Sequence, residues 1–268
     1  MGIVNVTPDS FSDGGEFLDR DAALEHCRAL VADGADILDL GGESTRPGAA
    51  PVDADEELAR VLPVLEGVRD AALETQLSID TSKAAVAHAA IAAGAGIVND
   101  VSALRADPEM AGVIASSGVE CCLMHMLGEP RTMQRDPRYE DVVDDVKAFL
   151  EERLGFAVEA GIREQRVMLD PGIGFGKTTE HNLELLRRLD ELVSIGRPLL
   201  VGTSRKSFLG TLAAAAQGRA EPPAPSQRLP GTLATCVLAL ERGARVFRVH
   251  DVAEVSQALA VAAATLRV

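Results

Sequence analysis

Basic side chains are scarce in this sequence, and their scarcity limits the partners that we expect. The 268 residues include 26 Lys and Arg against 41 Asp and Glu, so the formal net charge is −15. Proteins that hold nucleic acid or anionic membrane surfaces usually present an excess of positive charge. We therefore expect neither partner, although this balance still allows a local basic pocket for one small anion.

Cysteines are few, and long apolar runs are missing. The four cysteines, Cys27, Cys121, Cys122 and Cys236, lack the spacing of metal ligands, and the adjacent pair would face opposite sides of a strand. They are typical of reduced packing residues in a cytoplasmic protein. No apolar run approaches the roughly 20 residues that a membrane helix needs, and the N-terminus lacks the pattern of a signal peptide.

One glycine-rich stretch, "MLDPGIGFGKTTEHN" at 168–182, looks at first like a nucleotide-binding loop but fits neither common motif. A P-loop would need glycine where Pro171 stands, and proline has no N–H to offer a phosphate. Its glycines are spaced G-x-G-x-G, whereas a dinucleotide-binding turn needs G-x-G-x-x-G. What remains is an acid, Asp170, at the exit of a strand and followed by a flexible turn.

Short apolar runs alternate with longer amphipathic segments along the whole chain. The helical segments include 21–35, with Leu24, Cys27, Leu30 and Val31 on one face, and 142–161, which ends on a glycine. The apolar runs are nearly continuous, as expected of parallel strands that are covered on both faces. The predicted strands are 2–6, 35–42, 76–80, 96–101, 119–125, 166–170, 198–204 and 245–250.

Eight such units predict a TIM (β/α)8 barrel that forms a single domain over 1–268, close to the roughly 250 residues typical of that fold. A doubly wound open sheet is the alternative. Eight similar units, without a Gly-rich nucleotide turn after the first strand, favour closure into a barrel. The Pro-rich segment 217–231 is interpreted as a surface loop within the seventh unit.

A barrel would bring many polar side chains to one mouth, because the carboxyl ends of its strands meet there. A single Asn or Asp after a strand is usually a turn former or a helix cap. Polar residues at all eight strand ends indicate a binding site instead. They are Asn5, Glu43, Ser44, Thr45, Arg46, Asp80, Asn99, Asp100, His125, Asp170, Ser204, Arg205, Lys206, Arg248 and His250.

The chemistry of this set favours a nitrogen heterocycle. Asp80 and Asp170 could accept hydrogen bonds from ring N–H and NH₂ groups, and Asn99 offers both a donor and an acceptor. These groups suit a pyrimidine-like edge, and Lys206 could meet a ring carbonyl or nitrogen. Asp39, inside the second predicted strand, is expected to face inward and to be structural.

A second group of residues predicts an anion site. Arg248 and His250 immediately precede the last predicted helix, and cationic side chains at a helix N-terminus favour phosphate or pyrophosphate. The long loops 5–17 and 41–51 beside the mouth are typical of loops that close over a substrate. No Ser-His-Asp or Cys-His pair has a recognisable local context, so a covalent nucleophile is not indicated.

Together these stretches resemble the dihydropteroate synthase family. The matching motifs run in order over essentially the whole chain: "MGIVNVTPDSFSDGG", "DLGGESTRPGA", "IDTSK", "VNDVS", "LMHM", "LDPGIGFGKT", "SRKSFLG" and "RVHDV". The resemblance implies a Mg²⁺-dependent transferase of folate biosynthesis, which joins p-aminobenzoate to 6-hydroxymethyl-7,8-dihydropterin diphosphate and releases pyrophosphate. It also implies a homodimer and a p-aminobenzoate pocket for which sulfonamides compete.

The resemblance assigns individual roles as well. It implies that Asp80, Asn99, Asp170 and Lys206 hold the pterin and that Asn5 is the ligand of the magnesium ion. It implies that Arg248, His250 and Thr45 contact the diphosphate, and that Thr45, Arg46, Pro47, Phe175 and Ser204 form the p-aminobenzoate pocket. Relatives carry residues ahead of the first strand that cover the barrel floor, whereas this sequence begins at that strand.

Three other interpretations stay open at this point. A corrinoid-linked methyltetrahydrofolate methyltransferase has a similar barrel but no use for a diphosphate site, so "SRKSFLG" and "RVHDV" disfavour it. A non-catalytic pterin-binding paralogue is disfavoured by the intact "ESTRPG" loop. A phosphate-binding barrel of another pathway is the third possibility.

Overall fold

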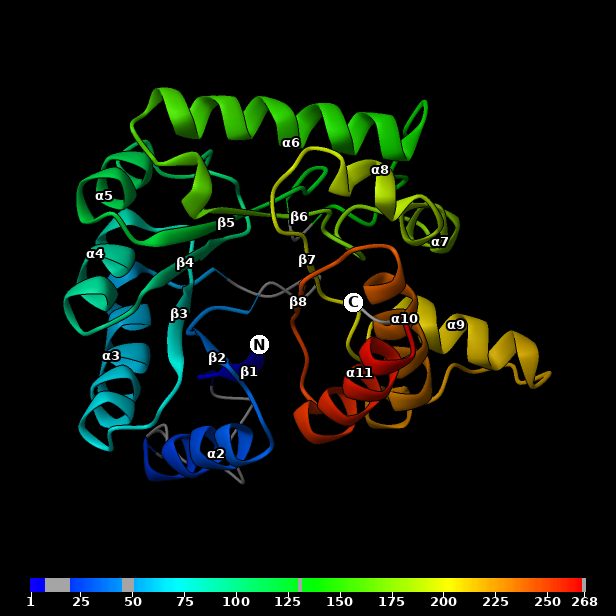
Figure 1. Ribbon diagram of the computed structural model, residues 1–268, viewed down its shortest axis with the longest axis horizontal. Helices are drawn as coiled ribbons and strands as arrows, with labels where there is room; N and C mark the ends of the chain where they lie inside the picture. Colours follow the sequence, from blue (N-terminus) through cyan, green and yellow to red (C-terminus); the bar gives the residue numbers. More distant parts are fainter. Residues whose placement is uncertain (8–19, 45–50, 130–131, 267–268) are drawn as a thin grey trace.

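A ring of parallel strands surrounded by helices forms the molecule (Figure 1). The computed structural model describes residues 1–7, 20–44, 51–129 and 132–266. Its strands are β1 (Gly2–Asn5), β2 (Ile37–Gly41), β3 (Gln76–Asp80), β4 (Ile97–Asp100), β5 (Glu120–Met124), β6 (Val167–Asp170), β7 (Leu200–Val201) and β8 (Val246–Phe247). Each matches one of the predicted strands in place, although most are shorter.

Helices follow the strands and stand on the outside of the ring (Figure 1). They are α2 (Arg20–Ala32), α3 (Ala54–Asp70), α4 (Ala84–Ala92), α5 (Met110–Ser117), α6 (Val142–Glu159), α7 (Thr179–Arg187), α8 (Leu189–Val193), α9 (Ser207–Ala216), α10 (Leu229–Glu241) and α11 (Val252–Leu266). Short 3₁₀ turns cover Glu164–Arg166 and Pro225–Gln227, the second inside the Pro-rich segment. Within the described residues, we find no helix with both the length and the apolar character to cross a bilayer.

The strands close into a barrel, which confirms the predicted fold and excludes the open sheet. β1 to β6 pair in sequence order in one parallel sheet, and β7 pairs with β8. Single bridges join the two sheets, Leu169 to Leu199 on one side and Gly2 to Val249 on the other. At the second junction Ile3 N donates to Val249 O over 3.0 Å.

The last two strands are much shorter than the sequence predicts, with two residues each. After β7, side chains of the next residues bond to other elements. Thr203 Oγ1 accepts a hydrogen bond of 2.8 Å from Thr235 on α10, and Ser204 Oγ lies 2.9 Å from His250 Nδ1. Backbone bonds continue beyond β8, since Arg248 N donates to Val201 O over 3.1 Å and Val249 N donates to Met1 O over 3.0 Å.

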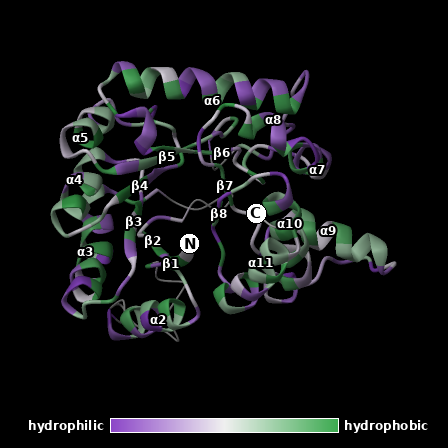
Figure 2. Cartoon of the chain, viewed as in Figure 1, coloured by the Kyte–Doolittle hydropathy of each residue, from purple (hydrophilic) through white to green (hydrophobic). Residues whose placement is uncertain are grey.

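Local sequence explains how individual helices begin, end and face the core. In α2 the buried residues are Ala23, Leu24, Cys27 and Leu30, close to the predicted face. The N-cap of α6 is Asp141, whose carboxylate accepts bonds from two backbone N–H groups. That helix ends just before Gly161, which adopts φ +96° where the chain turns away from the helix. Figure 2 shows hydrophilic and hydrophobic residues alternating along α6, as expected of a helix with one face in water.

Apolar side chains of the described residues form one large core and two smaller clusters. The larger core lies between the strands and the helices, and each fully buried Leu or Ile in it stabilises the fold by about 1.5–3 kcal/mol. A smaller cluster comprises Ile97, Cys122, Met168 and Leu200 from four different strands. Cys121 belongs to the larger core and Cys122 to the smaller, so the adjacent cysteines face opposite sides of β5 as predicted. All four cysteines are buried and free.

Candidate active site

Strand register places several predicted site residues side by side. Asn5 on β1 pairs with Gly41, Gly41 pairs with Asp80 on β3, and Asp80 pairs with Asn99 on β4. On the other side of the ring, Asp170 at the end of β6 pairs with Met124. The predicted convergence of strand ends is therefore confirmed for these residues.

A partly buried guanidinium lies between two carboxylates at the first of these edges. Arg248, which follows β8, donates from Nε to Asp39 over 2.6 Å and from Nη2 to Asp80 over 2.7 Å. Burial raises the pKa of Asp80 to about 7, although Arg248 opposes this shift. Burial alone would lower the pKa of Arg248, but Asp39 and Asp80 outweigh it and raise that pKa. The arginine is therefore held charged in place by both acids.

Asp170 and Lys206 form the opposite, lysine-bearing side. Asp170 Oδ1 accepts a hydrogen bond of 2.7 Å from Gly172 N, and Lys206 Nζ donates to the carbonyl of Ile173. Lys206 Nζ also lies 4.5 Å from the ring centroid of Phe175. Burial lowers the pKa of Lys206 to about 8 and raises the pKa of Asp170, and each group partly offsets the shift of the other.

The glycine-rich turn explains its own composition. Gly172 and Gly176 adopt φ values of +65° and +63°, which favour glycine. A Cβ atom on Gly172 would lie 1.8 Å from His125 O, and one on Gly176 would lie 2.5 Å from Leu127 O. The glycines therefore allow the turn to pack against the loop after β5, and this requirement accounts for them without a nucleotide.

Lys177, at the end of this turn, is a buried lysine whose burial was not predicted from the sequence. Its Nζ lies 2.8 Å from His125 Nδ1 and 3.0 Å from the carbonyl of Phe175. Burial lowers the pKa of Lys177 to about 7. Burial, reinforced by Lys177, lowers the pKa of His125 to about 2, so the imidazole is neutral. His125, predicted at the mouth, therefore contacts the turn through the side chain of Lys177.

An apolar wall stands beside the polar groups. Met124, Met126 and Met133 form a buried cluster, against which Val101 and Phe175 pack. Methionine and phenylalanine side chains present polarisable surfaces suited to the face of a flat ring. The site thus combines polar groups for a ring edge with an apolar surface for a ring face.

The residues predicted to meet an anion lie at the start of α11. His250 N donates to Ser204 Oγ over 3.1 Å, and the same hydroxyl lies 2.9 Å from His250 Nδ1. Arg205 pairs through its guanidinium with Asp251 and adopts φ +59°, an uncommon value for arginine. This ion pair joins the segments after β7 and β8, and so brings Ser204 and His250 together.

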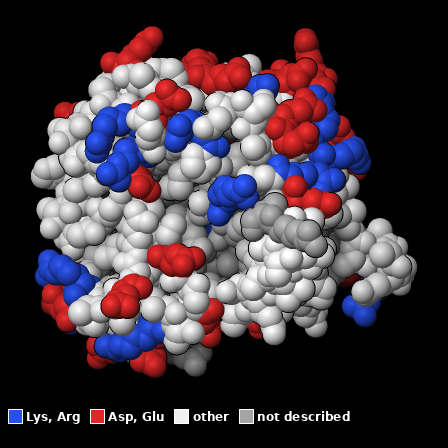
Figure 3. All heavy atoms as spheres, viewed as in Figure 1, with Lys and Arg blue, Asp and Glu red and all other residues white. Residues whose placement is uncertain are grey.

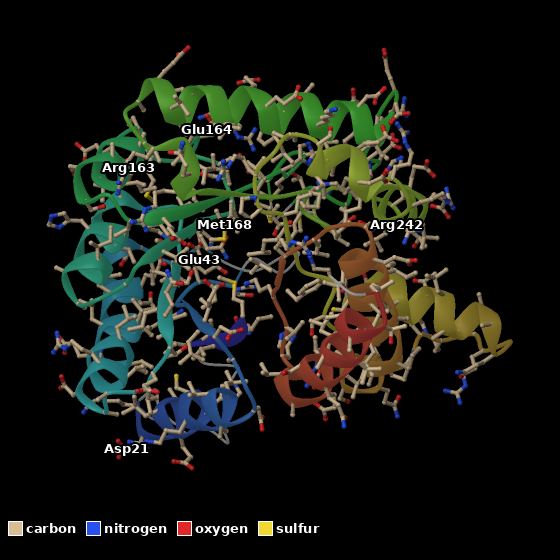
Figure 4. The ribbon with its side chains drawn as sticks, in the orientation of Figure 1. Asp21, Glu43, Arg163, Glu164, Met168 and Arg242 are labelled. Atoms are coloured by element: carbon tan, nitrogen blue, oxygen red, sulfur yellow. The ribbon has the colours of Figure 1, made fainter. Side chains whose placement is uncertain are left out.

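Some predicted residues cannot be placed in this way. Thr45, Arg46 and Pro47 lie outside the described residues, as do most of the loops 5–17 and 41–51. At the edge of the second loop, Glu43 accepts bonds from Lys83 Nζ and from Val52 N, and Lys83 also pairs with the fully buried Glu57. Sequence reasoning overlooked Glu57, although its place on the buried face of α3 was a usable signal. Figure 4 shows Glu43 and Met168 toward the middle of the ring, and Asp21 at its periphery on α2.

The sequence matches the family described as "Pterin binding enzyme" over residues 1–250. The dihydropteroate synthase of Escherichia coli (strain K12) is 46% identical over 266 residues, which are 99% of this chain and 91% of that protein. The chain belongs to the dihydropteroate synthase family.

Solved structures of this family superpose closely on the barrel. The Xanthomonas albilineans dihydropteroate synthase with 4-aminobenzoic acid has a TM-score of 0.90 at 48% identity and covers 100% of this chain, with 92% of its own chain covered. The same enzyme in complex with 7,8-dihydropteroate gives 0.87 at 46%, with coverages of 100% and 93%. A Yersinia pestis dihydropteroate synthase in a sulfonamide drug complex gives 0.91 at 44%, with coverages of 100% and 94%.

Proposed function

We propose that this chain is a dihydropteroate synthase that condenses 6-hydroxymethyl-7,8-dihydropterin diphosphate with p-aminobenzoate, giving 7,8-dihydropteroate and pyrophosphate. The observation that carries the proposal is the juxtaposition of Asp80 with Arg248 and of Asp170 with Lys206, in one barrel mouth beside an apolar wall. Relatives of high identity that carry this name, and solved structures with the aminobenzoate and the product, support it.

The pterin would lie between the two carboxylates. Asp80 and Asp170 can accept bonds from ring N–H and NH₂ groups, and Asn99 can meet a third position on the ring. Lys206 can donate to a ring carbonyl or nitrogen, and the methionine wall can cover one face. Asn99 and Asp170 are buried, and Asp80 and Lys206 are partly buried, which strengthens their hydrogen bonds to a ligand.

The diphosphate would lie toward the start of α11, where His250 precedes the backbone N–H groups of the helix N-terminus and Arg248 lies two residues earlier in the chain. Thr45 is a further candidate contact. Asn5, partly exposed at the end of β1, offers an amide oxygen for Mg²⁺. The donor fits, because Mg²⁺ prefers oxygen and usually takes most ligands from substrate phosphates and water. The ion would supply neutralising charge to the diphosphate.

The reaction then requires orientation more than a strong base. The bond between the pterin methylene carbon and the diphosphate oxygen breaks, and its electron pair leaves with pyrophosphate. Arg248 and His250 stabilise the departing charge, while Asp80 and Asp170 stabilise the cation-like methylene and ring. The neutral arylamine nitrogen forms the new C–N bond and afterwards loses one proton. Its pocket would comprise Thr45, Arg46, Pro47, Phe175 and Ser204, and this is the pocket for which sulfonamides would compete.

We also propose a homodimer and a cytoplasmic location. Leu238 on α10 and Val261 on α11 are 43% and 64% exposed, and Figure 3 shows a largely uncharged surface over these two helices. Such a surface is typical of an interface with a second copy. Light scattering of the protein and of a Val261→Glu variant would test the dimer. Four buried, unpaired cysteines are typical of a reducing compartment, which fractionation of cells would test.

The proposed activity is tested by mixing the protein with pterin diphosphate, p-aminobenzoate and Mg²⁺ and measuring pyrophosphate. Release that needs both substrates is the expected result. Release with the pterin diphosphate alone would indicate hydrolysis, and pterin binding without any release would indicate a non-catalytic paralogue. Either outcome would overturn the proposed synthase activity.

A further inference from the structure

Asp39 lies below the assigned ligand-binding groups, yet it contacts two of them. Its carboxylate is fully buried and accepts hydrogen bonds from Ser78 Oγ, from Asn99 Nδ2 over 3.0 Å, and from Arg248 Nε over 2.6 Å. Asp39 pairs with Ser78, two residues before Asp80 on β3, so it lies one step deeper in the barrel than Asp80. One carboxylate thus joins a pterin-binding candidate to a diphosphate-binding candidate.

We propose that Asp39 is a positioning residue that fixes the hydrogen-bonding orientation of Asn99 and the placement of Arg248. It would thereby fix where the pterin ring and its diphosphate bind relative to each other. The proposal rests on the proposed function, because it concerns the same two ligand groups. It assigns Asp39 no contact with substrate.

The effect on Asn99 follows from the chemistry of the two groups. An ionised carboxylate only accepts hydrogen bonds, so the amide must turn its Nδ2 toward Asp39. Its Oδ1 is then the atom left for a ligand, and the site presents an acceptor there. Asn99 is 4% exposed, so little room is available for an amide that changes between two orientations. Asp39 therefore selects ligands that carry an N–H donor at this position.

The effect on Arg248 is geometric. A guanidinium is planar, so a bond from Nε to Asp39 and another from Nη2 to Asp80 fix both its plane and its rotation. A pterin that takes hydrogen bonds from Asp80 would compete with the second bond. The bond to Asp39 lies deeper, and it would keep the arginine in place while Asp80 turns to the ligand.

The energetics of burial also point to this arrangement. A buried carboxylate without donors is costly, whereas Asp39 has three donors, one of them charged. Removing the negative charge leaves the three donors in place but weakens their common acceptor. The consequences should therefore appear at Asn99 and Arg248, and Ser78 provides a matched control because it touches neither ligand group directly.

The test compares Asp39→Asn with Ser78→Ala by isothermal titration calorimetry. The probes are 6-hydroxymethyl-7,8-dihydropterin, which lacks the diphosphate, and inorganic pyrophosphate with Mg²⁺. We expect Asp39→Asn to weaken both by about tenfold or more, the size of one charge-assisted hydrogen bond, and Ser78→Ala to weaken either by less than about threefold. Far-ultraviolet circular dichroism and thermal melting establish that each variant is folded.

A structural defect alone would lower affinity without regard to charge placement, and an exchange variant separates the two explanations. Asp39→Asn combined with Asn99→Asp keeps one buried carboxylate and reverses the donor and acceptor between the two positions. We expect it to recover part of the pterin affinity lost in Asp39→Asn. No recovery, or equal losses in Asp39→Asn and Ser78→Ala, would overturn the proposal.

A measurement on the unaltered protein covers the case in which the variants do not fold. The side-chain amide of Asn99 is assigned in ¹⁵N spectra by its absence from Asn99→Asp or, failing that, through its backbone connectivity. Its Nδ2 protons should be protected from solvent exchange with and without the pterin. Rapid exchange in the complex would overturn the proposal. Failure of the unaltered protein to bind the pterin at all would instead count against the proposed function.

Discussion

The two sides of the barrel mouth use opposite charges in the same environment. On the side of β2 to β4, Asp39 and Asp80 surround a single arginine that reaches across from β8. On the side of β6 and β7, Lys177 and Lys206 stand near a single acid, Asp170. Burial therefore raises the pKa of Asp80 and lowers the pKa values of the two lysines, which brings all three pKa values close to neutral pH. Such groups are typical of functional sites.

The two sides therefore supply different groups for the proposed reaction. The carboxylates of the two sides can accept hydrogen bonds from the N–H groups of one heterocycle. The lysines balance the charge of Asp170, and the arginine can balance the charge of the departing pyrophosphate. The acid-rich side is fixed by the bonds of Asp39, whereas the lysine-rich side is fixed by the glycine turn and its packing on the loop after β5. Substitutions on the two sides should therefore fail in different ways.

The largest effect is expected on the lysine-rich side, from Asp170→Asn. The amide keeps the volume of the side chain but replaces one acceptor oxygen by an NH₂ donor. That donor would face the N–H donors of the pterin. We expect pterin affinity to fall by about 100-fold or more, because a buried polar mismatch is added to a lost charged bond. Calorimetry with the pterin measures it. Asp190→Asn on the exposed end of α8 is the control, and retained affinity in Asp170→Asn would contradict the assignment.

The acid-rich side should be most sensitive to the shape of its cation, which Arg248→Lys tests. Lysine keeps the charge but cannot bond Asp39 and Asp80 through two fixed nitrogens. We expect affinity for pyrophosphate with Mg²⁺ to fall by about tenfold. Arg187→Lys, at a residue whose side chain is 64% exposed, should leave it unchanged. Equal affinities in the two variants would show that charge alone suffices.

The pH dependence of pterin affinity should separate the two sides within one experiment. Asp80 has a raised pKa of about 7, so it becomes protonated below neutral pH and loses acceptor capacity. Affinity should therefore fall by up to about tenfold per pH unit below 7. Lys206, with a lowered pKa of about 8, should limit affinity above that value. Asp80→Asn should remove only the fall in affinity at acid pH, and Lys206→Arg should remove only the fall at alkaline pH. Titration of the pterin itself affects all variants equally. A fall at acid pH that persists in Asp80→Asn would belong to another group.

The sequence predicts the barrel and the convergence of its polar strand ends because both depend on local patterns. A repeated βα unit makes all the strands parallel, so their carboxyl ends meet at one mouth of the barrel. Asp80, Asn99 and Asp170 could therefore be predicted to lie at that mouth. The extent of β7 and β8 could not, because strand length depends on backbone pairing between distant segments, such as the bridges of Leu169 with Leu199 and of Gly2 with Val249. Burial of Lys177 was equally inaccessible, since a lysine after a glycine turn is usually solvated. Its contact with His125 forms because the turn folds back on the loop after β5.

The last prediction concerns Lys177 and the stability of the fold, not ligand affinity. Because its pKa falls from an ordinary 10.5 to about 7 on folding, the unfolded chain binds more protons than the folded chain between these values. The free energy of unfolding should therefore rise with pH, by about 2 kcal/mol from pH 7 to pH 9 from this group alone. Lys177→Met should remove that part of the rise in urea unfolding measured at both pH values. Lys147→Met, on the outer surface of α6, should keep it. If Lys177→Met keeps the full rise as well, Lys177 is charged in the folded protein throughout this pH range, and the lysine-rich side of the mouth carries more positive charge than the burial of Lys177 implies.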